Sequence, residues 1–153
     1  MAIAPVIKDR TDPPLVRALT AGGLYFLVAF GFGFAFGAVR ELVVTPRLGV
    51  DLAIVIETPL MAIVAWFAAR FSVGQCAVPR GVFYRLAMGL LALGLLIGVE
   101  ELLTRALRGG SLFELWATFG VLATVANLAG LAWFTFAPIL AGTPPVKQID
   151  PHA

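Results

Sequence analysis

The chain is poor in the residues on which most active sites depend. Its 153 residues include one cysteine, Cys76, and one histidine, His152, which lies in the C-terminal tail. A single cysteine excludes an internal disulfide and a metal site built from several cysteines. The lone histidine lies outside the apolar segments, which excludes a membrane-embedded histidine pair that ligates haem or a metal. The sequence therefore predicts no cofactor and no metal, and we expect Cys76 to be an exposed, reduced loop residue without a role.

Motifs of catalysis and of nucleic-acid binding are also absent from the sequence. It holds no Gly-rich phosphate loop, and no serine stands beside a histidine base. The 11 Lys and Arg residues are scattered singly, which argues against a nucleic-acid surface and suits residues that set membrane topology. An intramembrane enzyme would have to work with Glu, Arg, Asn and Thr alone, so we expect a protein that is not an enzyme.

Charged residues are scarce and apolar residues are abundant. Only 13% of the residues are charged, against about a quarter in an average soluble domain, and 60% are hydrophobic. The mean hydropathy is +0.96. A chain of this length cannot bury so much apolar surface in its own core, so lipid must cover the remainder. We therefore expect an all-α integral membrane protein.

Four apolar runs predict four transmembrane helices in an up-down-up-down bundle. The expected helices are about 19–41, 51–69, 82–107 and 112–137, within a transmembrane domain of residues 18–140. Ser111 and Glu114 form a capping-box pattern that predicts the start of the fourth helix, and Pro138 predicts its end. The Pro-rich polar segments 1–17 and 141–153 are expected to be flexible tails.

The distribution of Lys and Arg predicts the orientation of the bundle. Cytoplasmic loops carry an excess of these residues, so the richer side is expected to face the cytoplasm. The two tails and the middle linker carry Lys8, Arg10, Arg17, Arg70, Arg80, Arg85 and Lys147, whereas the other two connections carry Arg40, Arg47, Arg105 and Arg108. Both termini are therefore predicted to be cytoplasmic.

Small residues mark two helix faces for close packing. Gly33 and Gly37 form a small-xxx-small pair in the first helix, and Gly94 and Gly98 form another in the third. Such faces let helix backbones approach closely, and in lipid this packing drives association. Asn127, near the middle of the fourth helix, offers an interhelical hydrogen bond worth about 1 kcal/mol or less. The alternative is that these glycines only reflect the frequency of Gly in transmembrane helices.

The stretch 40–61 carries the most informative charges. Glu57 lies inside the second apolar run, roughly 12 Å below its entry, where a charge costs about 2.5–3.5 kcal/mol at most. Arg40 lies roughly 6 Å deep near the end of the first helix. Side chains tilt toward their helix N-terminus, so in this antiparallel pair Arg40 and Glu57 point at each other. We expect them to pair, with Glu100 as a third member and Arg47 as the next candidate.

Three interpretations of these charges stay open. A structural ion network gives a non-enzymatic structural or accessory membrane protein, whose partners are the lipid bilayer and a membrane protein or a second copy. A titrating proton or cation site gives a small channel or a proton-coupled carrier that uses Glu57. In the third interpretation, Glu57 faces a lipid-thinned rim.

Three short motifs resemble a group of uncharacterised small bacterial four-helix inner-membrane proteins. Arg40 is followed by the sequence PRLG at 46–49 and by ETPLM at 57–61. The third helix then ends in an acid, Glu100, before a Ser-led fourth helix. The resemblance covers most of residues 20–140. It implies the same fold and a location in the bacterial inner (cytoplasmic) membrane, and it brings no known activity.

Overall fold

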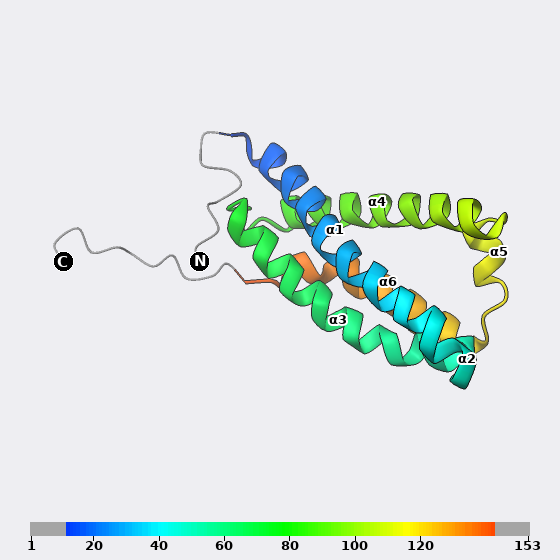
Figure 1. Ribbon diagram of the computed structural model, residues 1–153. Coiled ribbons are helices and arrows are strands. Elements are labelled where there is room, and N and C mark those ends of the chain that lie inside the picture. The colour runs from blue at the N-terminus through cyan, green and yellow to red at the C-terminus, as the bar shows by residue number, and fades with distance from the viewer. Residues whose placement is uncertain (1–11, 143–153) are drawn as a thin grey trace.

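The structure is a computed structural model that describes residues 12–142. Within that range the secondary structure is helical, and four helical segments are long and apolar enough to cross a membrane. They comprise Pro14–Leu48, Val50–Gln75, Val82–Arg108 and Val121–Leu140 (Figure 1). The prediction of an all-α, four-helix membrane bundle is confirmed, and residues 1–11 and 143–153 of the expected tails lie outside the described residues.

The first span is longer than the expected 19–41. Helix α1 (Pro14–Val39) continues into a π-helical turn, η1 (Arg40–Val44), and then into the short α2 (Thr45–Leu48). Pro46 has no N–H to donate and its ring crowds the carbonyl four residues back. The wider π-turn accommodates it, since the Thr45 N–H bonds to the Arg40 carbonyl, five residues back. Gly49 ends the span with φ +79°, a conformation that favours glycine.

The second and third spans keep their expected order but differ in length. Helix α3 (Val50–Gln75) runs past the expected end at residue 69, because Arg70 stays helical with its guanidinium over the Trp66 ring one turn back. Helix α4 (Val82–Arg108) ends at Gly109, whose φ of +74° provides a left-handed cap.

The fourth span corrects the expected boundaries 112–137. The capping box of Ser111 and Glu114 is present, but it starts only the short α5 (Leu112–Trp116). The membrane-length helix α6 (Val121–Leu140) starts after Gly120, whose N–H bonds to the Asp51 carboxylate. Pro138 does not end this helix and lies in its last turn, where the missing N–H removes one hydrogen bond close to the end.

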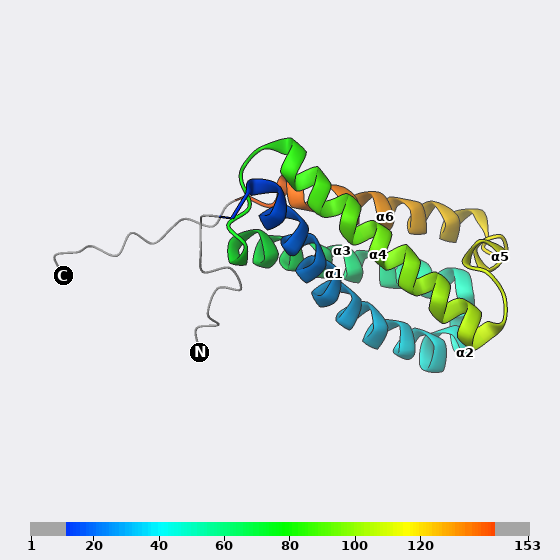
Figure 2. The ribbon, with the colours of Figure 1, turned by 90° about the horizontal axis from the view of Figure 1, so that it is seen from above.

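The four long helices alternate in direction and form a ring in which α1 and α6 each pack against both α3 and α4. The start of α1, the end of α3, the start of α4 and the end of α6 lie at one end, which we call the terminal half (Figures 1 and 2). The segments α2 and α5 lie at the other end, which we call the loop half.

Packing is concentrated in the terminal half. Backbones meet there because the contact positions are small: a Cβ at Gly22 would lie 2.9 Å from the Met88 carbonyl oxygen, and one at Gly89 would overlap the Thr135 carbonyl. Tyr25 stacks on Phe134 with ring centroids 4.5 Å apart. More than half of the core cluster is alanine, and its other members are larger side chains: Ala18, Ala21, Ala29, Ala65, Ala68, Ala69, Ala92, Ala137, Ala141, Tyr25, Phe26, Val73, Cys76, Val78, Met88 and Phe134. In the loop half, α4 runs away from α3 toward α5 (Figure 1).

Candidate functional site

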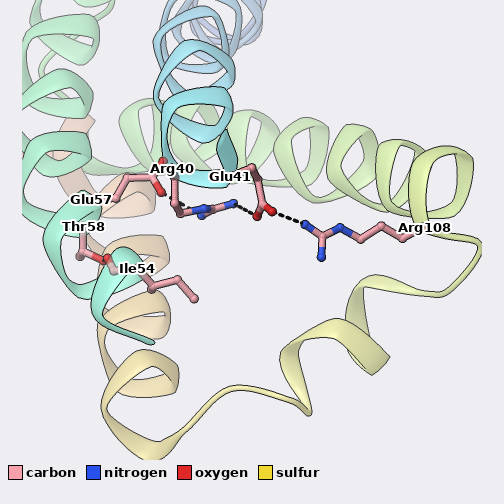
Figure 3. A network of polar contacts seen from close by, with 6 residues as sticks. All are labelled: Arg40, Glu41, Ile54, Glu57, Thr58 and Arg108. Carbon is pink, nitrogen blue, oxygen red and sulfur yellow. Dashed lines mark hydrogen bonds and ion pairs between the residues drawn. The ribbon is translucent and has the colours of Figure 1, made fainter. Parts of the chain in front are cut away.

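The loop half holds a chain of ion pairs that links three helical segments. The Arg40 Nη1 atom donates to Glu57 Oε2 at 2.8 Å, and Arg40 Nη2 lies 3.5 Å from Glu41 Oε1. Glu41 Oε2 in turn lies 2.9 Å from Arg108 Nη2. Figure 3 shows the Arg40 guanidinium between the two carboxylates, with Arg108 reaching Glu41 from α4. The network therefore runs from α3 through η1 to α4.

The backbone places these side chains where the first span leaves its regular helix. Arg40 and Glu41 open the π-turn η1, which is the turn that Pro46 imposes. Glu57 lies in α3 on the neighbouring segment, beside Thr58, whose hydroxyl donates to the Ile54 carbonyl at 2.8 Å. The Glu57 side chain is only 16% exposed, whereas Arg40 is 32% exposed. Glu57 is thus the more deeply placed partner, and Arg40 supplies its counter-charge.

The other two charges expected in this network lie differently. Glu100 on α4 is half-buried and interacts electrostatically with both Arg40 and Glu57. Within residues 12–142 it forms no ion pair or hydrogen bond, so it lies near the network without a direct bond to it. Arg47 is exposed and bonds to the Val43 carbonyl of its own turn at 3.0 Å. Arg47 therefore does not pair with Glu57.

Sequence reasoning missed two members of the network, Glu41 and Arg108. Glu41 adjoins Arg40 in sequence, and Arg108 ends α4 on the same side of the membrane, so both signals were available. A comparison of two neighbouring antiparallel helices covered only Arg40 and Glu57. It could not find the Arg108–Glu41 pair, because that pair depends on α4 ending beside η1. Five charged groups gather here, three carboxylates (Glu41, Glu57, Glu100) and two guanidinium groups (Arg40, Arg108).

Two further acids tether the loop segments. Glu101 Oε1 pairs with Arg105 Nε at 2.5 Å, and Glu101 Oε2 accepts the Leu112 N–H at 2.7 Å. Asp51, in the first turn of α3, accepts the Gly120 N–H at 3.0 Å. These bonds satisfy backbone donors near the starts of α5 and α6, groups that have no partner within their own helices.

The expected packing glycines differ in their surroundings. Gly33 faces α3, since an added Cβ would lie 3.3 Å from Met61 Cε. At Gly37, Gly94 and Gly98 an added Cβ would meet nothing within 4 Å, so the expectation of close packing within the bundle is wrong at these three positions. The helices diverge where they lie, and the close approaches occur at Gly22 and Gly89 instead.

Asn127 does not form the interhelical hydrogen bond expected of it. The residue is half-buried on α6, and within residues 12–142 its side chain has no hydrogen-bond partner. The interhelical bonds of α6 form nearer the terminal half instead, where Trp133 Nε1 donates to the Ala62 carbonyl at 3.0 Å.

Cys76 is buried, which corrects the expectation of an exposed loop thiol. The residue is 0% exposed because the chain turns back at Ala77, with φ +47°, and the Val78 N–H bonds to the Val73 carbonyl at 3.1 Å. Burial raises the pKa of the Cys76 thiol above its usual range, and the nearby Arg17 guanidinium partly opposes this. Arg17 Nε also donates to the Cys76 carbonyl at 3.2 Å.

A buried arginine closes the terminal half. Arg85 is 3% exposed and extends from α4 toward the end of α6, where Nη1 donates to the Pro138 carbonyl at 3.1 Å and to the Ala141 carbonyl. Its Nε donates to the Pro79 carbonyl at 3.3 Å. A cation at a helix C-terminus is favourable because the last carbonyls lack partners and carry partial negative charge.

Two apolar grooves lie on α3, and Glu57 lines neither. One, of about 270 Å³, lies between α1 and α3 at Val28, Phe32, Ile63, Val64, Phe67, Ala68 and Phe71. The other, of about 320 Å³, lies between α3 and α6 at Ala62, Ile63, Trp66, Phe67 and Trp133. In the part of the chain that the structure describes, no group of three or more His, Cys, Asp or Glu could hold a metal.

Comparisons with protein-family models, with curated proteins and with solved structures find no match to this chain.

Proposed function

We propose that this multi-pass membrane protein is a non-enzymatic accessory protein, whose ion network shapes the loop half and whose α4 face binds a membrane-embedded helix. The observation that carries the proposal is the outer face of α4. Leu90, Gly94, Gly98 and Leu102 follow one another at intervals of four residues, and all four are exposed. A small-xxx-small face lets a second helix approach closely, and here it turns outward from the chain's own bundle.

The ion network supports a structural role for the buried charges. Arg40 lies between two carboxylates, and Glu41 is shared with Arg108, so each of these four side chains has a partner. The pairing joins η1, α3 and α4 in the half where packing is sparse. A network of this kind fixes the position of α4, and with it the direction in which the Gly94 and Gly98 face points.

Photo-crosslinking from α4 tests the proposed partner contact. A crosslinker that replaces Leu102 should give one discrete product in native membranes, and the added substitution Gly98→Leu should abolish it because it fills the face. A crosslinker at Phe83, which is 69% exposed on the same helix in the terminal half, is the matched control. Two differently tagged copies distinguish a second copy from another protein. Equal products from positions 102 and 83 would contradict the proposal.

The second candidate is a proton-coupled carrier or small channel that uses Glu57. The observation that favours it is the charge balance, since three carboxylates face two guanidinium groups and Glu100 has no direct partner among the described residues. An unpaired carboxylate at membrane depth favours binding of a proton or a cation. Proton flux into proteoliposomes, abolished by Glu57→Gln with the fold retained, would establish this candidate over the first.

The proposed location is the bacterial inner membrane with both termini in the cytoplasm. The excess of Lys and Arg on the side of the termini supports this orientation. Reporter fusions at the two termini should both give the cytoplasmic signal. A periplasmic signal from either terminus would contradict the proposed orientation.

A further inference from the structure

The Arg70 guanidinium has no carboxylate partner among the described residues. Its side chain is exposed on α3, and within residues 12–142 its guanidinium forms no hydrogen bond and no ion pair. Its one described interaction is with the Trp66 ring, whose centroid lies 6.0 Å from the guanidinium carbon. Arg has five N–H donors in a planar fork suited to phosphate, so most of its binding capacity remains unused.

The position of Arg70 along the helix places it close to the membrane boundary. The 26 residues of α3 make a helix of about 39 Å, against a hydrocarbon core of about 30 Å, so a few residues at each end extend beyond it. Arg70 lies five residues before the end of α3, about 8 Å along the axis. Trp66 is one turn closer to the bilayer centre, and the Arg70 guanidinium lies over its ring.

Beside this arginine lies the apolar groove between α3 and α6. Its lining consists of Ala62, Ile63, Trp66, Phe67 and Trp133, and it is a shallow, open apolar groove of about 320 Å³. Trp66 and Trp133 lie with ring centroids 6.1 Å apart, and the bond from Trp133 Nε1 to the Ala62 carbonyl fixes the second ring. The groove thus spans two helices, and one of its lining residues, Trp66, is the ring over which the Arg70 guanidinium lies.

We propose that this groove holds an acyl chain of an anionic phospholipid, whose phosphate is bound by Arg70. Charge complementarity supports that occupant. The described residues of the terminal half include four arginines (Arg17, Arg70, Arg80, Arg85) and one acid, Asp12. Basic pockets between transmembrane helices bind anionic headgroups, and an anionic lipid would supply the counter-charge that the described residues do not give Arg70. This site is separate from the ion network and from the α4 face.

Native mass spectrometry of the purified full chain in a non-ionic detergent tests the proposal. With equal amounts of palmitoyl-oleoyl phosphatidylglycerol and phosphatidylcholine added, the protein should retain the anionic lipid preferentially. Arg70→Gln should lower that retention about fivefold, the effect of one basic residue at a membrane surface. Arg47→Gln, an exposed arginine in the loop half, is the matched control and should change nothing. Trp66→Leu should weaken retention while Arg70 remains.

Each other outcome overturns the proposal. Equal retention of the two lipids would show that the groove binds lipid without selectivity for the headgroup. Equal losses in Arg70→Gln and Arg47→Gln would show that only total charge matters. Competition by millimolar inorganic phosphate with no dependence on the acyl chain would show an ion site without a lipid groove. Melting curves in phosphatidylcholine alone verify that each variant is folded, and Arg70→Lys retains the charge if Arg70→Gln is unstable.

Discussion

In the terminal half, alanines and glycines let helix backbones meet, whereas in the loop half arginine and glutamate side chains bridge helices that diverge. A Cβ at Gly89 has no room, but one at Gly98, nine residues along the same helix, meets nothing within 4 Å. Conversely, the ion pairs of the described residues join Arg40, Glu41, Glu57, Glu101, Arg105 and Arg108, which lie toward the loop half. One short chain thus uses two different means of holding membrane helices together.

The difference between the two halves follows from the physical properties of the lipid bilayer. Lipid tails are as apolar as leucine, so apolar surface alone does not drive helices together in a bilayer. Van der Waals contact through small residues serves where backbones can approach closely. Charged side chains are longer and can link helices whose backbones lie further apart. Pairing is then favoured because an unpaired charge at depth is costly. The two halves should therefore respond to different substitutions.

The largest expected effect is on the ion network. Arg40→Met leaves Glu57 without its counter-charge and should cost about 2–4 kcal/mol of stability, somewhat less than the roughly 3–5 kcal/mol for buried pairs in soluble proteins. Glu57→Met should cost less, because Arg40 retains Glu41 at 3.5 Å. Arg47→Met, an exposed control, should change stability by less than about 0.5 kcal/mol. Thermal unfolding in one detergent measures all three, and equal losses for Arg40→Met and Arg47→Met would contradict the pairing.

The next effect separates the halves on a single helix. Gly89→Ala places a methyl group against the Thr135 backbone and should cost about 1–3 kcal/mol through overpacking. Gly98→Ala meets open space and should be neutral or stabilising by about 0.5–1 kcal/mol, because alanine is the better helix former. The difference in melting temperature between the two variants measures this contrast. Similar melting temperatures would show that α4 is packed alike along its length.

The smallest effect concerns the closure of the terminal half around Cys76. The thiol is buried and its pKa is raised, so the reactive thiolate is scarce at pH 8. Maleimide should label Cys76 at least about tenfold more slowly than a cysteine placed at the exposed Gly81 in a Cys76→Ala background, and the rate should keep rising above the usual thiol range. Equal labelling rates at pH 8 would mean that this end of the bundle is open.

The sequence was sufficient to predict the four spans and the approach of Arg40 to Glu57. Apolar run length determines the spans, and the tilt of side chains in an antiparallel helix pair determines that approach. It was not sufficient for the glycines, because Gly22, Gly89 and Gly98 are alike locally and only the crossing of the helices decides which one is packed. Burial of Cys76 depends on a left-handed turn at Ala77, a residue type that rarely adopts one.

The double variant Arg40→Met with Glu57→Met tests the central claim most directly, which is that paired charges hold the loop half together. Removing both partners leaves no uncompensated charge at Glu57, so the double variant should recover much of the stability that Arg40→Met alone loses. The measurement is the folded fraction against temperature for wild type, the two single variants and the double variant in the same detergent. A double variant that is no more stable than the worse single variant would contradict the claim.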